Sequence, residues 1–251
     1  MKKIIIVGST IQPRMDKDFT YAPGVRSVFN RDERARQTIS SAAALKINFP
    51  NDRIVVVDSS MNTDGLVDAF GYLGIEYVAL KDISIERTEF VNTNRNKSAC
   101  ECALLYTYME KNREMLLGYD YIIKATGRYF NFGLGEWDFT EENKDKILFK
   151  KPSTFEWTDV WRYNAVDRRA IDGDNLLRQY CTVVYAFGTV HLEKFLDIYK
   201  ATEHLLQHPN MIHMDIESLI YYMTRPYEAN IIETDWKVSG WDGVGGNQVY
   251  Y

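Results

Sequence analysis

The chain has 251 residues, of which 45% are hydrophobic and 26% charged, and this globular composition argues against disorder. Its formal net charge of −5 argues against a broad nucleic-acid surface, because such surfaces are normally basic. Its apolar runs, such as residues 4–7 and 54–57, are far shorter than the roughly 20 residues that cross a bilayer.

The N-terminal half alternates short apolar runs with longer amphipathic segments. The pattern predicts strands over residues 2–7, 53–58, 75–80 and 119–125, and helices over residues 31–48, 65–73 and 97–117. Continuous apolar strands are typical of a parallel sheet that is covered on both faces. On the first helix, the side chains expected to face the sheet are Ile39, Ala42, Ala43 and Ile47. The alternation of strand and helix predicts an α/β fold with right-handed crossovers.

The C-terminal half is less regular. Its pattern predicts a glycine-containing loop over residues 130–135, short strands, two helices and a glycine-rich tail over residues 239–247. The strands are expected over residues 147–149, 182–187 and 231–232, and the helices over residues 192–206 and 215–223. Because no repeat or linker interrupts the chain, we expect a single domain over residues 1–251.

Several common nucleotide and metal motifs are missing. The turn after the first strand, Gly8-Ser9-Thr10-Ile11-Gln12-Pro13, lacks the second glycine of a dinucleotide-binding turn. The sequence contains no P-loop, no H-E-x-x-H motif and no paired C-x-x-C motif, so neither a P-loop NTPase nor a zinc site is supported. Three cysteines, two of them at positions 100 and 102, do not form a disulfide scaffold and fit a cytoplasmic location.

Polar residues gather where the predicted strands end, which is the edge at which α/β sheets bind ligands. Asp58 ends the second strand and could accept hydrogen bonds from a ribose or a base, or it could form a turn. Lys97 opens a long helix after a polar loop. A cation at a helix N-terminus favours a phosphate, although a capped, solvated helix start is the simpler alternative.

The segment from Tyr119 to Phe130 carries cations at the end of the fourth predicted strand. Lys124, Thr126 and Arg128 follow the apolar run, and Gly127 permits a tight bend. Buried cations are costly unless an anion sits beside them, and a diphosphate would meet that need. The alternative is an internal salt bridge to Asp120 or Glu136.

Two further groups are candidates for chemistry. His213, Asp215 and Glu217 surround the start of a helix. A carboxylate there could act as a general base, or the acids could simply favour the helix N-terminus. The tail with Trp241 and Asp242 could form a flap over a sugar, although a poorly ordered terminus is the default.

Taken in order, these pieces resemble a small nucleotide-sugar glycosyltransferase of the GT-A type. They are similar to the enzymes that build bacterial capsules and O-antigens, and to related enzymes of large viruses. The resemblance rests on four stretches, of which K-x-[ST]-G-R-Y is the most specific: Glu33-Arg34-Ala35-Arg36-Gln37-Thr38-Ile39-Ser40-Ser41, Asn96-Lys97-Ser98-Ala99-Cys100-Glu101, Ile123-Lys124-Ala125-Thr126-Gly127-Arg128-Tyr129 and Asp215-Ile216-Glu217-Ser218-Leu219.

The resemblance implies a GT-A-like, Rossmann-type mixed sheet flanked by helices. Residues 1–130 would bind the nucleotide sugar, and residues 131–251 would form the acceptor side and a C-terminal flap. Donor binding would fall to Gly8, Ser9, Thr10, Arg36, Asp58, Lys97, Lys124, Thr126 and Arg128. The acceptor side would include His213, Trp241 and Asp242. If the enzyme inverts configuration, Glu217 first and Asp215 second would deprotonate the acceptor hydroxyl.

One departure from the family concerns the metal. Many GT-A enzymes carry an Asp-x-Asp motif after the fourth core strand, but here that place reads Lys124-Ala125-Thr126. We therefore assign no metal ligand, although Asp120 and Asp138 stay possible ones, and a cationic side chain could neutralise the diphosphate instead.

The resemblance also implies the partners, which are a nucleoside-diphosphate sugar and a glycan acceptor. No nucleic acid and no transmembrane segment are expected, and peripheral membrane association stays open. Two alternatives also stay open: a sugar nucleotidyltransferase, and a non-catalytic nucleotide- or glycan-binding module.

Overall fold

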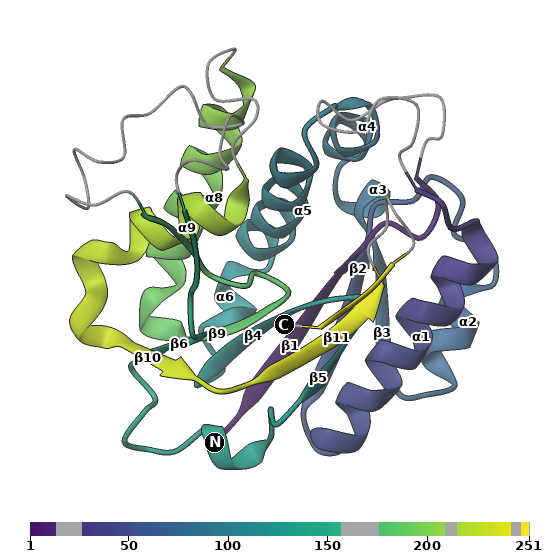
Figure 1. The fold of residues 1–251 in the computed structure, drawn as a ribbon. Coiled ribbons are helices and arrows are strands. Elements are labelled where there is room, and N and C mark those ends of the chain that lie inside the picture. Colours follow the sequence, from purple (N-terminus) through teal and green to yellow (C-terminus); the bar gives the residue numbers. More distant parts are fainter. Residues whose placement is uncertain (14–26, 157–175, 209–214, 242–246, 251) are drawn as a thin grey trace.

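The centre of the molecule is a mixed sheet flanked by helices (Figure 1). This computed structural model describes residues 1–13, 27–156, 176–208, 215–241 and 247–250. The sheet has the strand order β10-β6-β9-β4-β1-β2-β3. Its strands are β1 (Lys3–Ser9), β2 (Arg53–Asp58), β3 (Glu76–Ala79), β4 (Tyr121–Thr126), β6 (Ile147–Lys150), β9 (Val184–Gly188) and β10 (Ile231–Thr234). The predicted α/β class with a mixed sheet is therefore confirmed.

The strand directions divide the sheet into two parts. Strands β3, β2, β1 and β4 run parallel to one another, as the N-terminal alternation predicts. Strand β9 runs antiparallel between β4 and β6, and β6 and β10 are again parallel. The reversed strand therefore joins the regular N-terminal part to the later strands.

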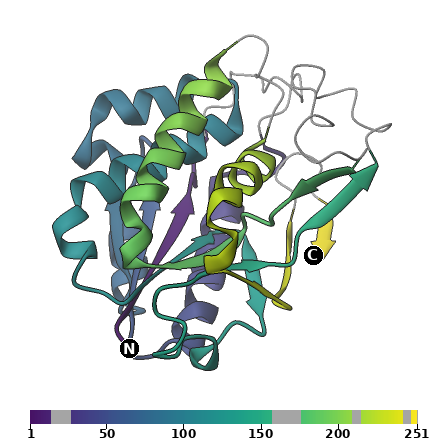
Figure 2. The same ribbon diagram turned by 90° about the vertical axis from the view of Figure 1, so that its left-hand side faces the viewer.

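Helices cover both faces of the sheet, as Figures 1 and 2 show. Alternate β1 residues point to opposite faces, so Ile4 and Ile6 meet one helical layer while Ile5 and Val7 meet the other. The first layer contains α4 (Ile85–Thr93), α5 (Lys97–Lys111), α8 (Leu192–Gln207) and α9 (Ile216–Thr224). The second contains α1 (Arg31–Asn48) and α2 (Leu66–Gly71). Both faces are therefore apolar and buried, which explains the unbroken apolar strands.

Smaller elements complete the described structure. A three-stranded sheet packs on the α1 side and consists of β5 (Tyr129–Phe132), β11 (Lys237–Trp241) and β12 (Gln248–Tyr250). Strands β7 (Ser153–Glu156) and β8 (Leu176–Gln179) pair antiparallel with each other. The remaining elements are α3 (Leu80–Ile83), α6 (Arg113–Leu116), η1 (Glu136–Asp138), η4 (Thr189–His191) and η5 (Arg225–Asn230).

Several local expectations differ from this structure. Residues 130–135 are not only a loop, because Tyr129–Phe132 pairs with β11. The helix expected over residues 97–117 breaks at Asn112, between α5 and α6. Part of the glycine-rich tail is also strand, since β11 extends to Trp241. Both β5 and β11 gain their pairing from a distant partner, which a local sequence pattern does not reveal.

The inward face of α1 also differs from the prediction. Of the four residues expected to face the sheet, Ala42 is buried, Ile39 and Ala43 are partly buried, and Ile47 is 79% exposed. The buried positions are instead Arg34, Thr38, Ser41, Ala42 and Leu45. Three of these five residues are polar, and two of them donate to backbone: the Ser41 hydroxyl to the Tyr129 carbonyl at 2.5 Å, and Arg34 Nε to the Thr10 carbonyl at 2.7 Å.

Candidate functional site

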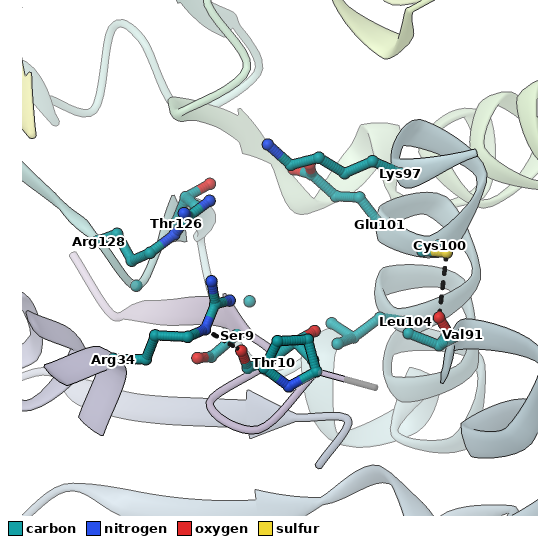
Figure 3. Close-up of a pocket in the computed structure, with 13 residues that line it drawn as sticks. Ser9, Thr10, Arg34, Val91, Lys97, Cys100, Glu101, Leu104, Thr126 and Arg128 are labelled. Carbon is teal, nitrogen blue, oxygen red and sulfur yellow. Dashed lines mark hydrogen bonds between the residues drawn. The ribbon is translucent and has the colours of Figure 1, made fainter. Parts of the chain in front are cut away.

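A pocket opens at the carboxyl ends of β1 and β4, between α1 and α5 (Figure 3). It encloses about 800 Å³, part of which is open solvent. Its described lining residues are Gly8, Ser9, Thr10, Pro13, Arg34, Val91, Lys97, Cys100, Glu101, Leu104, Thr126, Gly127 and Arg128. The pocket therefore gathers six of the predicted donor-binding residues: Gly8, Ser9, Thr10, Lys97, Thr126 and Arg128.

The turn after β1 is held against β2 by Asp58. This carboxylate is fully buried and accepts from the Ile11 amide at 2.8 Å, the Tyr77 hydroxyl at 2.7 Å and the Ser60 amide at 3.3 Å. It does not line the pocket. Asp58 thus matches the turn-forming alternative, because its two oxygens accept three hydrogen bonds from the protein itself.

Arg34 reaches the pocket from α1. The helix begins at an Asn30 cap, and the buried Arg34 side chain lies one turn later. Its Nε donates to the Thr10 carbonyl at 2.7 Å and its Nη1 to the Ser27 hydroxyl at 3.1 Å. These bonds fix the guanidinium beside the turn after β1.

Arg36, which the resemblance assigned to donor binding, is exposed and outside the pocket lining. Two helical residues add about 200° of rotation, so Arg34 and Arg36 point in nearly opposite directions. The signal that identifies Arg34 is its place in the stripe with Thr38 and Ser41.

Lys97 reaches the pocket from α5 on the opposite side. Asn96 caps this helix by accepting from the Ala99 amide at 3.0 Å. Helical spacing then places Lys97, Glu101 and Leu104 on the pocket face. Burial, followed by the positive charge of Arg128, lowers the pKa of Lys97 below its usual range. Within the described residues, Lys97 has no hydrogen-bond or ion-pair partner.

Arg128 enters the pocket from the turn after β4. Its side chain is only 7% exposed, and its Nη1 has no hydrogen-bond partner among the described residues. Leaving a buried charge unpaired costs on the order of several kcal/mol. Figure 3 shows Arg34, Lys97 and Arg128 around the same space. The arrangement is suited to an anion.

Gly127 lets the turn after β4 lie against α1. A Cβ at this position would come within 2.8 Å of Thr38 Cγ2 and 3.4 Å of Ser9 Cβ. Its amide donates to the Gly8 carbonyl at 3.1 Å. The glycine is therefore required by close approach, since its φ is not positive.

Lys124 is placed differently from the expectation that it faces a diphosphate. Its ammonium is fully buried, forms an ion pair with Glu101, and donates to Thr126 Oγ1 at 2.9 Å and to the Thr182 carbonyl. It does not line the pocket, whereas Glu101 does.

The internal ion pair of Lys124 matches the alternative interpretation, although with an acid that the sequence did not indicate. The two acids considered there lie elsewhere: Asp120 accepts from the Lys2 amide at 2.6 Å, and Glu136 pairs with Lys3 at 2.6 Å.

The acids proposed as general bases lie outside the pocket lining. Asp215 caps α9 by accepting from the Ser218 amide at 2.8 Å. Glu217 accepts from the Thr182 hydroxyl at 2.9 Å, so Thr182 connects it to Lys124. Burial raises the pKa of Glu217 to about 7, with further contributions from the charges of Asp215 and Glu101.

The acceptor-side residues are only partly described. His213 and Asp242 lie outside the described residues. Trp241 ends β11 and packs edge-on against Phe130, with ring centroids 6.5 Å apart. It does not line the pocket.

Metal-binding side chains do not cluster in the described part of the chain, which contains no group of three or more His, Cys, Asp or Glu residues placed to hold an ion. Of the two possible ligands named from the sequence, Asp138 accepts from the Gly135 amide at 2.9 Å and Asp120 binds the Lys2 amide. None of the helices in the described segments is long and apolar enough to span a membrane.

Comparison with known proteins gives structural likenesses alone, because no family model and no curated protein matches the chain. One similar structure is a protein of Desulfovibrio desulfuricans G20 that is provisionally assigned as a nucleotide-diphospho-sugar transferase. It has a TM-score of 0.46 and 8% identity, over 93% of this chain and 80% of that chain. Another is mouse xyloside xylosyltransferase 1 in its apo form, with a TM-score of 0.45 and 9% identity, over 93% of this chain and 84% of that chain. At these values, neither likeness decides the activity of this protein.

Proposed function

We propose that the protein is a glycosyltransferase that moves a hexose or pentose from a nucleoside-diphosphate donor to a hydroxyl of a glycan acceptor. We place this reaction in the cytoplasmic synthesis of a surface polysaccharide or related glycan. The observation that carries the proposal is the buried guanidinium of Arg128, which lacks a partner in the described structure and faces a pocket shared with Arg34 and Lys97. A diphosphate is an anion with the charge and size to occupy that space.

The chemistry requires stabilisation of the departing diphosphate. As the bond between the sugar and the diphosphate breaks, negative charge grows on the leaving oxygen, and preorganised cations lower the energy of that state. We assign this role to Arg128 and Lys97. The turn from Gly8 to Thr10 would hold the rest of the donor.

Two stereochemical outcomes stay within the proposal. For inversion, Glu217 would take the proton of the acceptor hydroxyl, and a pKa of about 7 suits a general base near neutral pH. Asp215 is the second candidate. Retention of configuration would need no such base.

The alternatives differ in chemistry that can be measured. A sugar nucleotidyltransferase would need a glycine-rich turn bearing Arg or Lys after β1, which residues 8–13 do not supply. A binding module would hold nucleotides without turning over a sugar nucleotide. Incubating the protein with a panel of sugar nucleotides separates these cases, because a transferase releases some nucleoside diphosphate by hydrolysis and a binding module releases none.

Our first prediction concerns nucleotide binding. We expect at least one of UDP, GDP, CDP and dTDP to raise the melting temperature, since a ligand that binds only the folded state stabilises it. The Arg128→Ala variant should lose most of this shift. Lys200→Ala removes an equal charge from an exposed position on α8 and should keep it. Unchanged nucleotide affinity in Arg128→Ala would contradict the phosphate assignment.

A further inference from the structure

We propose that the pocket binds the diphosphate of its donor without a divalent metal ion, using Arg34, Lys97 and Arg128 in place of the metal. This inference rests on the proposed function and specifies how its anionic substrate is held.

The described lining of this pocket does not supply the set of oxygen ligands that a divalent ion prefers. Such ions bind carboxylates and carbonyl oxygens. Within the described lining, Glu101 is the one carboxylate, and it is already engaged in an ion pair with the buried Lys124. Asp58, at the end of the neighbouring strand, already accepts hydrogen bonds from three protein donors. The donor set therefore does not fit the divalent-metal site that many GT-A enzymes carry.

The charge of the site also argues against a divalent ion. The charged residues of the described lining are Arg34, Lys97, Arg128 and Glu101, whose formal net charge is +2, although the whole chain carries −5. A divalent ion placed among these cations would be repelled, whereas a diphosphate would be attracted. Burial is the main cause that lowers the pKa of Lys97, and the positive charges of Arg128 and Arg34 lower it further.

The three cations also differ in the element that carries them and in the way they bind phosphate. They come from α1, α5 and the turn after β4, so they reach the pocket from different sides. Guanidinium groups bind phosphate oxygens through two parallel hydrogen bonds, and an ammonium binds as a point charge. The site therefore provides directed donors as well as charge.

The test is a titration of the purified full chain with UDP, GDP, CDP and dTDP by isothermal calorimetry. One series contains excess EDTA and the other contains Mn²⁺. We expect the best nucleotide to bind in EDTA with an affinity within about threefold of that in Mn²⁺, since the protein supplies the neutralising charge. A gain of about tenfold or more with Mn²⁺ would overturn the inference and leave the proposed function standing. Binding in neither series would overturn both.

Two conservative variants make the test specific to the cations. Lys97→Met keeps the side-chain length, and Arg128→Lys keeps the charge while losing the planar fork. Each should weaken binding in EDTA by about tenfold or more, and added Mn²⁺ should not restore it. Lys200→Met, on the exposed face of α8, serves as the control. Recovery of either variant by Mn²⁺, or wild-type binding by either variant in EDTA, would contradict the proposal. Melting temperatures report that each variant is folded.

Discussion

Two buried cations at the end of β4 show that burial alone does not define a ligand site. Lys124 lies within β4 and Arg128 follows the turn after it, and both are at least nine-tenths buried. Lys124 is neutralised by Glu101, whereas the Arg128 Nη1 lacks a partner in the described structure. The presence or absence of an internal partner, which depends on α5, separates a structural cation from a candidate anion ligand.

Glu217 yields a prediction about stability and pH. Its pKa is about 7 in the folded protein, above the ordinary value of 4.5. An acid whose pKa is raised on folding favours the folded state fully below the unfolded pKa, and this contribution is lost as pH rises through the folded pKa. We therefore expect Glu217→Gln to gain melting temperature over the wild type as pH rises from about 4.5 to 7, with a constant difference above that range.

The measurement is a series of melting curves across this pH range. Glu110→Gln removes an exposed carboxylate on α5 and should track the wild type at every pH. A difference between Glu217→Gln and the wild type that does not change with pH would show that the carboxylate is not held in its protonated form near neutrality.

At the level of elements, Arg128 follows a turn after β4 that lies close against α1. We expect Gly127→Ala to weaken nucleotide binding, because its Cβ would press on Thr38 and displace the turn. Thr38→Ala in the same chain should recover part of the affinity by removing the atoms that clash. The measurement is nucleotide affinity by calorimetry.

Gly71→Ala is the matched control for this prediction, because a Cβ there meets no atom within 4 Å. Wild-type affinity in the Gly127→Ala single variant would mean that the close approach does not place Arg128.

The elements that the sequence predicts well are those whose neighbours are close in the chain. The predicted bounds of α1 and β2 match the structure, because a capping box and an unbroken apolar run mark them locally. Strands β5 and β11 were not predicted, since each is defined by the other across about a hundred residues. Helices α3 and α4 were also missed: their polar sequences have little amphipathic pattern, and packing on α5 stabilises them.

The same distinction between local pattern and distant contacts applies to the residues of the site. The turn after β1, Lys97 and Arg128 could be placed from the sequence because each follows an apolar run or opens a helix. The choice between Arg34 and Arg36 required the rotation of α1 against the sheet, and the Lys124–Glu101 pair required the packing of α5. Side-chain partners across elements are not encoded in local spacing.

For the molecule as a whole, β9 ties the two halves of the chain together. It pairs with β4 from Tyr121 to Ala125, and these β4 residues are fully buried. A fragment of residues 1–130 would expose this apolar edge, and unprotected edge strands pair with other chains. We expect the fragment to aggregate or to unfold without a cooperative transition. Size-exclusion chromatography and circular dichroism test this, and a monomeric fragment with cooperative melting would contradict it.

The same strand pairing has a consequence for synthesis on the ribosome. The β4 residue Ala125 pairs with Val184, so about sixty residues must be added before the edge of β4 can be closed. At 5–20 residues per second, that interval lasts roughly 3 to 12 s. During this time the edge of β4 in the nascent chain has no partner strand, and slower translation lengthens this interval. Yield in a cell should therefore depend on chaperones that shield this edge until Val184 emerges.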